Sequence, residues 1–136
     1  MTPFVPRILI AEDEQRIVSF LEKGLRQQGY ETVSTGQGDR TIQLILENGF
    51  DLVLLDLGLP VKSGWAVLNE IEEADRSIPV IIITAQEGVG DRLNDVSTNI
   101  SSYLVTPFRF SVLLDAIREC FASDELGESD GSSDSI

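Results

Sequence analysis

The chain has 136 residues, of which 42% are hydrophobic, and this length suffices for one domain with a buried core but not for two. It carries 10 basic and 23 acidic residues, and the resulting net charge of −13 repels nucleic-acid phosphates and anionic membrane surfaces. Histidine is absent and Cys120 is the single cysteine, which excludes an internal disulfide framework, histidine metal ligands and Ser-His-Asp catalysis.

Short apolar runs that predict β-strands recur along the chain. In chain order they are Ile8–Ala11, Thr32–Val33, Leu52–Leu55, Val80–Ile83 and Tyr103–Val105. Four of these five runs are continuously apolar, which is typical of strands buried on both faces of a parallel sheet.

Segments with a helical spacing of apolar residues follow each of the first three runs and the last one. The stripes are Ile17, Phe20, Leu21 and Leu25; Ile42, Ile45 and Leu46; Val67, Leu68 and Ile71; and Leu113, Ala116, Ile117, Cys120 and Phe121. Residues 88–99 are rich in poor helix formers, so we expect a short, irregular or mobile helix there. The order of elements predicts an α/β fold, a flavodoxin-like (βα)5 three-layer sandwich with a five-stranded parallel sheet in the order 2-1-3-4-5.

Residues 123–136 differ in composition from the rest of the chain. They are mostly Ser, Gly, Asp and Glu, with Leu126 and Ile136 as the larger apolar residues. We therefore expect one domain over residues 1–122, followed by a disordered acidic tail or linker. No segment approaches the roughly 20 apolar residues that span a bilayer, and no basic region precedes an apolar run at the N-terminus. These features predict a cytoplasmic protein without membrane insertion.

Acidic residues stand where two of the predicted strands end. Glu12 and Asp13 follow the first run and Asp56 follows the third, and neighbouring parallel strands bring their carboxyl ends to one edge of the sheet. Three carboxylates about 4 Å apart repel by roughly 4 kcal/mol per pair at an effective dielectric of about 20, so the cluster calls for a cation. Oxygen ligands with room for water and a phosphoryl group fit Mg²⁺. Asp56 is the best candidate nucleophile toward a phosphoryl donor, although strand-terminal acids can also merely solvate a sheet edge.

Five motifs resemble, in order and spacing, the receiver domain of two-component response regulators over about residues 6–122. They are ILIAED (Ile8–Asp13), DLVLLDLGLP (Asp51–Pro60), Gly64, PVIIITA (Pro79–Ala85) and YLVTPF (Tyr103–Phe108). The resemblance implies that Asp56 accepts a phosphoryl group from a sensor histidine kinase or phosphotransfer protein. It also implies that Mg²⁺ is bound by Asp13, Asp56 and the carbonyl oxygen of Gly58, with Glu12 acting through water.

The same resemblance assigns roles outside the acidic cluster. Thr84 would be the switch hydroxyl, with Ala85 small enough to leave it accessible, and Tyr103 would be the switch aromatic. The peptide bond before Pro107 would be cis. The implied activity is signalling to a downstream protein target through the face formed by the fourth helix, fifth strand and fifth helix, and not turnover of an external substrate.

One position departs from the family pattern. The family has Lys immediately before the proline that follows the fifth strand, where the ammonium pairs with the phosphoryl oxygens, and this chain has Thr106. Loss of that charge partner weakens phosphorylation and its coupling to the switch. Lys62 and Arg109 are candidate replacement cations, and solvated surface charge is the alternative for both.

Two further classes of function compete with a phosphoacceptor. A degenerate receiver would keep the fold and bind a partner independently of phosphorylation, and Thr106 favours that interpretation. A dinucleotide-binding oxidoreductase would have G-x-G-x-x-G after the first strand, where this chain has Ala11–Arg16. A phosphatase with an aspartyl nucleophile would usually have a D-x-D pair there, and that pair is missing too.

Overall fold

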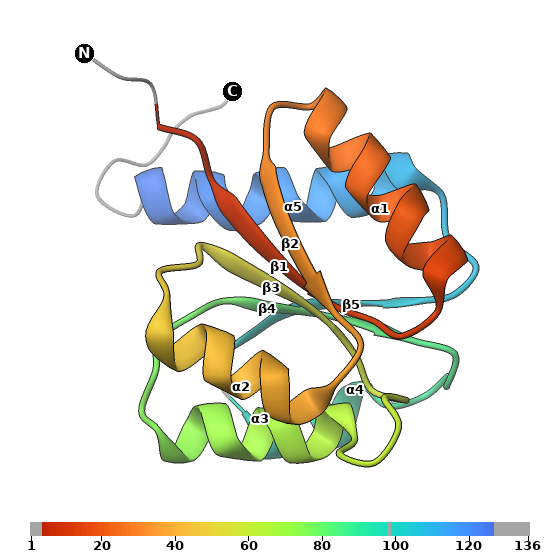
Figure 1. Cartoon of the computed structure of the whole chain (residues 1–136), viewed down its shortest axis with the longest axis vertical. Helices are drawn as coiled ribbons and strands as arrows, with labels where there is room; N and C mark the ends of the chain where they lie inside the picture. The colour runs from red at the N-terminus through yellow and green to blue at the C-terminus, as the bar shows by residue number, and fades with distance from the viewer. Residues whose placement is uncertain (1–3, 98, 127–136) are drawn as a thin grey trace.

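The computed structural model describes residues 4–97 and 99–126, in which five parallel strands alternate with five helices (Figure 1). The elements are β1 (Arg7–Ala11), α1 (Gln15–Gln27), β2 (Glu31–Thr35), α2 (Gly38–Glu47), β3 (Leu52–Asp56), α3 (Gly64–Glu73), β4 (Val80–Thr84), α4 (Gly90–Val96), β5 (Ile100–Val105) and α5 (Phe110–Leu126). The sheet order is β2-β1-β3-β4-β5, which confirms the predicted topology.

The three central strands form the middle of the core. Every residue of β4 is buried, and so are the four apolar residues Leu52–Leu55 of β3. The edge strands β2 and β5 alternate or mix exposed and half-buried residues instead. Burial of one such Leu or Ile side chain contributes about 1.5–3 kcal/mol, so β1, β3 and β4 fix the sheet.

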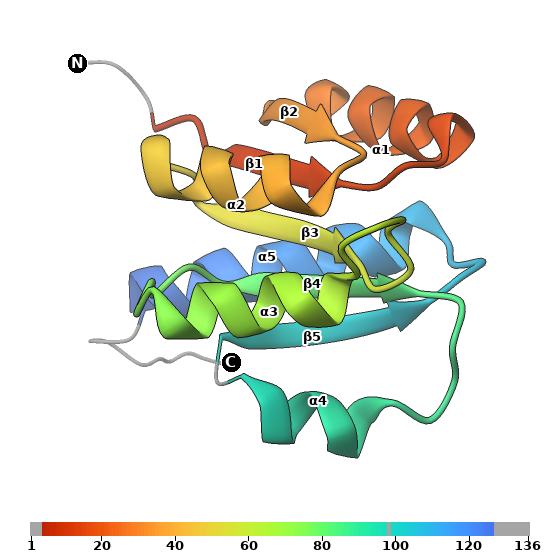
Figure 2. The same cartoon turned by 60° about the horizontal axis from the view of Figure 1, so that its bottom comes forward.

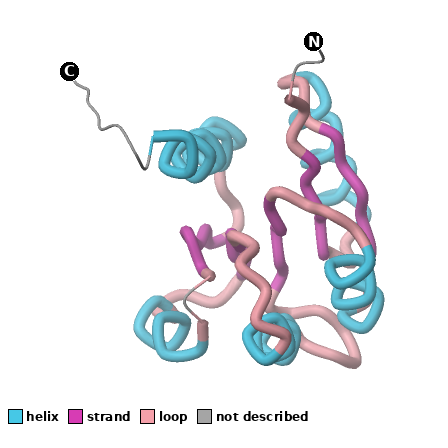
Figure 3. The backbone as a smooth tube through the Cα atoms, turned by 90° about the vertical axis from the view of Figure 1, so that its left-hand side faces the viewer, coloured by secondary structure: helices cyan, strands magenta, loops and turns pink. Residues whose placement is uncertain are grey.

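The helices cover both faces of the sheet. Ile8 and Ile10 pack with Leu113 and Ile117 on the α1–α5 face, whereas the opposite face packs against α2, α3 and α4 (Figures 2 and 3). Phe20 and Leu46, which the helical spacing places on apolar stripes, are instead 46% and 43% exposed.

The fourth helix is short, as its composition predicts. It covers only Gly90–Val96 and lies in a layer with α2 and α3 (Figure 2). At its end the buried Ser97 donates a hydrogen bond to Oε1 of Glu72 on α3 (2.8 Å). This contact ties α4 to α3.

The last helix is longer than the composition predicts. It ends at Leu126, so the first four residues of the expected tail, 123–126, are helical here. The remainder of that segment, residues 127–136, lies outside the described residues, and its disorder stays a prediction. Within the described ranges, no helix is both long and apolar enough to cross a membrane.

Candidate functional site

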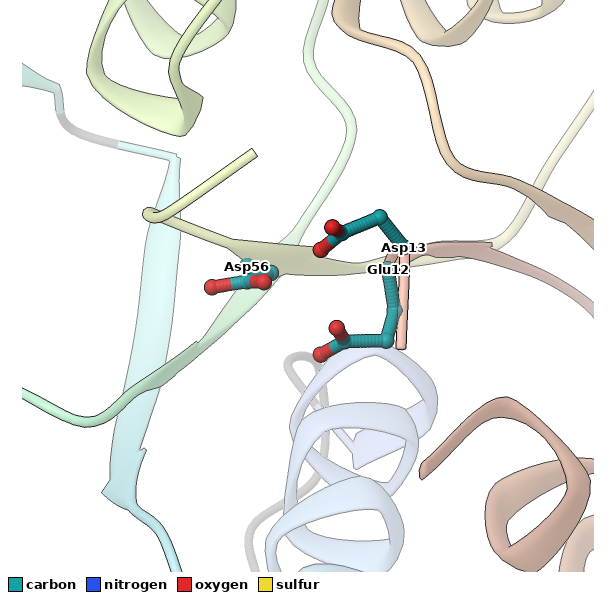
Figure 4. Close-up of side chains that lie close together, drawn as sticks. All are labelled: Glu12, Asp13 and Asp56. Atoms are coloured by element: carbon teal, nitrogen blue, oxygen red, sulfur yellow. The ribbon is translucent and has the colours of Figure 1, made fainter. Parts of the chain in front are cut away.

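Three carboxylates converge where β1 and β3 end. Glu12 and Asp13 follow β1, and Asp56 is the last residue of β3, the strand that pairs with β1. One oxygen from each carboxylate lies within 4.8 Å of those of the other two, and Glu12 and Asp13 extend toward Asp56 (Figure 4). The parallel pairing of the two strands therefore produces the cluster that the sequence predicts.

Glu12 is the buried member of this cluster. Its residue is 3% exposed, and Oε2 accepts a hydrogen bond from the backbone N–H of Glu14 (3.0 Å). Burial, the largest cause, acts with the negative charges of Asp56 and Asp13 to raise the pKa of Glu12 to about 7, against the lowering effect of the hydrogen bond from Glu14. The protein thus holds this acid in an environment that disfavours its charged form.

The loop after β3 fixes the position of Asp56. The backbone N–H of Gly58 donates to Oδ1 of Asp56 (2.8 Å). Gly64, which opens α3, packs against the same backbone, and a Cβ there would lie 2.6 Å from Cα of Leu57. Only glycine fits this approach, so the loop returns directly to the end of β3.

Thr84 closes the site from the β4 side. It is 2% exposed, and its hydroxyl oxygen accepts a hydrogen bond from the backbone N–H of Gln86 (2.9 Å). Ala85 follows it without a side chain long enough to cover the hydroxyl. Together with the carboxylates they line a cavity of about 190 Å³, here named the carboxylate pocket. Its lining residues are Glu12, Asp13, Glu14, Ile17, Asp56, Ile83, Thr84, Ala85 and Thr106.

Thr106 lies in this pocket at the position where the resemblance implies a Lys. Its backbone N–H donates to the carbonyl oxygen of Thr84 (2.8 Å), and the Thr106–Pro107 peptide bond is cis, the conformation that the resemblance implies. No Lys or Arg of the described chain lines the carboxylate pocket. The pocket is therefore lined by acidic, apolar and hydroxyl-bearing side chains.

Neither cation considered from the sequence reaches the pocket. Lys62 is bound elsewhere: its Nζ lies 3.0 Å from Oδ1 of Asp39 and also pairs with Glu70. This pairing links α2 to α3. Arg109 is exposed at the start of α5 and does not line the pocket.

Tyr103 lies on the outer side of β5. It is 39% exposed, and a Cβ added at Gly90 would lie 3.0 Å from its hydroxyl oxygen, so the ring contacts the start of α4. Tyr103 pairs with Ile82, two residues before Thr84, so Thr84 and Tyr103 lie on the same face of the sheet, with the hydroxyl at the pocket and the ring at the start of α4.

A groove borders the pocket between α1 and the loop after β5, and we name it the α1–β5 groove. It has a volume of about 450 Å³ and is lined by Glu14, Arg16, Ile17, Phe20, Thr106, Pro107 and Phe108. Reasoning from the sequence missed Arg16. The available signal was a cation in the first turn of a helix, a position that favours acids.

The donor set of the cluster fits Mg²⁺. All the side-chain donors are carboxylate oxygens, which this hard cation prefers, and the carbonyl of Gly58 follows the strand end directly. A divalent cation would also offset the repulsion that raises the pKa of Glu12.

The sequence of this chain resembles those of known proteins. A family described as "response regulator receiver domain" matches residues 8–118. Transcriptional regulatory protein HprR of Escherichia coli (strain K12) is 36% identical over 112 residues, which are 82% of this chain and 50% of that protein. This chain therefore spans about half the length of such curated relatives.

Two solved structures share the fold at higher coverage. The receiver domain of sensor histidine kinase PA1611 of Pseudomonas aeruginosa PAO1, described with a magnesium ion coordinated in its active site cleft, is 29% identical with a TM-score of 0.77. It aligns with 88% of this chain and 100% of its own. Response regulator TrrA of Thermotoga maritima, in complex with Mg²⁺ and BeF, is 27% identical with a TM-score of 0.76, covering 85% and 99% of the two chains.

Proposed function

This chain belongs to the response regulator receiver domain family, and from that premise we propose that Asp56 accepts a phosphoryl group from a sensor histidine kinase or phosphotransfer protein. The observation that carries the proposal is the carboxylate pocket, where Glu12, Asp13 and Asp56 meet beside the hydroxyl of Thr84. We expect this reaction to take place in the cytoplasm, where the sequence predicts the protein to be.

The proposed reaction is an in-line transfer to the carboxylate of Asp56. A carboxylate oxygen forms a bond to phosphorus as the P–N bond of a phosphohistidine breaks, and the departing imidazole nitrogen keeps the electron pair and takes a proton. The N–H of Gly58 binds one oxygen of Asp56 and so restrains the carboxylate, and the other oxygen would attack the donor. The chain assists only its own phosphorylation and dephosphorylation.

Asp13, Asp56 and the carbonyl oxygen of Gly58 would hold Mg²⁺, and Glu12 would act on it through water. Bound there, the cation withdraws negative charge from the transferring phosphoryl oxygens. Asp13 is exposed and Glu12 is buried, so Asp13 would approach the cation from the solvent side and Glu12 from the protein interior.

Signalling would pass from Thr84 to the α4–β5–α5 face. The hydroxyl of Thr84 would leave its bond with Gln86 and donate to the phosphoryl group, and the ring of Tyr103 would turn inward from Gly90. The surface that changes would be read by a downstream protein target. With a net charge of −13, this chain does not bind nucleic acid in the proposal.

A second candidate is an interaction module that works without phosphorylation. The supporting observation is the carboxylate pocket itself, where Thr106 stands in place of a cation and none is among the lining residues. Such a module would bind its partner equally well with or without a phosphoryl group.

Intact mass after incubation with Mg²⁺ and acetyl phosphate separates the two. We expect the wild-type protein to gain the mass of one phosphoryl group and Asp56→Asn to gain none. Absence of any gain in the wild type at high donor concentration, with the fold intact by circular dichroism, would favour the interaction module.

A further inference from the structure

A phosphoryl group in the carboxylate pocket leaves negative charge that the pocket does not balance. Glu12, Asp13 and a doubly charged phosphoryl group on Asp56 together outweigh one Mg²⁺. Glu14 adds a fourth acid to the wall, and the described part of the chain contributes no Lys or Arg to it. The phosphorylated state therefore requires one more cation.

Arg16 is the cation among the residues that line the groove beside the carboxylate pocket. The α1–β5 groove that it lines shares Glu14, Ile17 and Thr106 with the carboxylate pocket, so the two spaces adjoin at those residues. Thr106, which lines both spaces, is shorter than the Lys that the resemblance implies there, so less side chain stands between them.

The side chain of Arg16 is available for such a role. It is exposed and has no hydrogen bond, ion pair or ring contact within residues 4–97 and 99–126. The side chains of Lys23, Arg40 and Arg109 likewise make no such contact in that part of the chain, yet none of them lines the pocket or the groove.

The backbone position of Arg16 is also unfavourable for the helix alone. It is the second residue of α1, where the unpaired N–H groups already create positive potential, and the first turn contains no acidic residue. A cation there costs local stability and adds to the positive potential beside the pocket. A residue that is unfavourable for its own helix, as Arg16 is here, is expected at functional sites.

We infer that Arg16 turns across Thr106 into the carboxylate pocket and binds the phosphoryl group on Asp56. The inference rests on the proposed function. Its planar guanidinium donates two hydrogen bonds to phosphoryl oxygens, a geometry that suits phosphate better than a lysine ammonium does. Arg16 is thus a binding residue for the transferred group, brought from α1 and not from the end of β5.

The test compares rates of phosphorylation by acetyl phosphate and Mg²⁺, followed by intact mass, in the full chain. Arg16→Ala is expected to slow the wild-type rate by about tenfold to a hundredfold, the effect of one lost charge-assisted contact. Arg109→Ala, which removes the same exposed charge outside the groove, is expected to leave the rate unchanged. Adding Thr106→Lys to Arg16→Ala should restore the rate, because a cation then enters from β5.

A second readout needs no covalent transfer. Beryllofluoride with Mg²⁺ mimics the phosphoryl group, and Trp65, which follows Gly64 at the start of α3, is expected to report its binding through a change in fluorescence. Arg16→Ala should weaken this binding by a similar factor, without lowering the thermal midpoint in the absence of both ions. Arg16→Lys should bind with intermediate affinity.

The outcomes distinguish the two proposals. Equal rates and affinities for Arg16→Ala and Arg109→Ala would overturn the role of Arg16 while Asp56 remains a phosphoacceptor. Phosphorylation of Thr106→Lys alone, with none in the wild type, would overturn it as well. Absence of phosphorylation in every variant, Thr106→Lys included, would overturn the proposed function and the role of Arg16 with it.

Discussion

Arg92 stacks on Trp65, with its guanidinium carbon 4.0 Å from the ring centroid. This contact joins α4 to the first turn of α3, one residue after the glycine that packs against the backbone of Asp56. Together with the hydrogen bond from Ser97 to Glu72, it attaches both ends of α4 to α3. A helix of seven residues with weak intrinsic propensity is therefore held by these contacts to α3 together with the burial of Leu93 in the core.

Removal of the stack should be visible in the emission of the single tryptophan. Arg92→Ala takes the guanidinium off one face of the ring, so we expect a red shift of Trp65 emission as water replaces it. The free energy of unfolding should fall by about 0.5–1 kcal/mol, the contribution of a partly exposed cation–π pair. Arg40→Ala, which removes an exposed charge from α2, serves as the control, and identical spectra for both variants would contradict the stack.

Ser97 provides the second attachment of α4. Its hydroxyl donates to Glu72 and accepts the backbone N–H of Asn99 (3.0 Å). Ser97→Ala should cost about 1.5–3 kcal/mol of unfolding free energy, because a hydrogen bond to a charged acceptor and a backbone partner are lost together. Hydrogen exchange should accelerate in residues 90–97 more than elsewhere. Ser19→Ala, at an exposed position of α1, should change neither quantity, and uniform loss of protection over the whole sheet would argue against a local attachment.

The central strands were predictable from the sequence, whereas the edge strands were only partly so. Helices cover both faces of the central strands, so buried residues such as Leu54 and Ile82 belong to continuous apolar runs. In β2 and β5 one neighbour is missing, so exposed residues interrupt the run and both strands are longer than their apolar letters suggest. The end of α5 was missed for another reason: Ser123–Leu126 has a tail-like composition, but it continues an established helix.

At the site, the sequence predicted what backbone topology alone determines. Pairing of β1 with β3 brings Asp13 and Asp56 together whatever the side chains around them do. Lys62 and Arg16 depend on loop paths and side-chain partners, which sequence spacing does not encode. Lys62 turns toward Asp39, and Arg16 faces a groove that exists only because α1 and the loop after β5 meet.

Asp56→Asn should separate repulsion in the pocket from metal binding. The amide keeps an oxygen that can accept from Gly58 but removes one of three clustered negative charges. Without Mg²⁺, urea denaturation should give an unfolding free energy about 1–2 kcal/mol above that of the wild type, because a partly solvated like-charge contact is relieved. Saturating Mg²⁺ should stabilise the wild type and barely affect the variant. Asp115→Asn on the exposed side of α5 should retain the full response to Mg²⁺, and an equal response in both variants would place the metal elsewhere.

Glu12 should make the metal-free protein less stable as the pH rises. Its pKa is about 7 in the folded protein against 4.5 in the unfolded chain, so the folded state binds more protons between these values. The unfolding free energy then declines as the pH increases across that window, by about 3 kcal/mol from this group at 1.36 kcal/mol per pKa unit. Below about pH 4.5 both states are protonated and the contribution is complete; above about pH 7 both are ionised and it is gone.

Glu12→Gln isolates this contribution from that of the other acids. The amide does not titrate, so the unfolding free energy of the variant relative to the wild type should rise with pH from about 4.5 to 7, measured by urea denaturation in a chelating buffer. With saturating Mg²⁺ the trend should disappear, because the cation favours the ionised carboxylate and draws its pKa down. Parallel curves for the two proteins in the chelating buffer would mean that Glu12 is already ionised in the folded state. The buried acid would then be balanced by a partner within the protein, and the pocket would not need a cation to hold its charge.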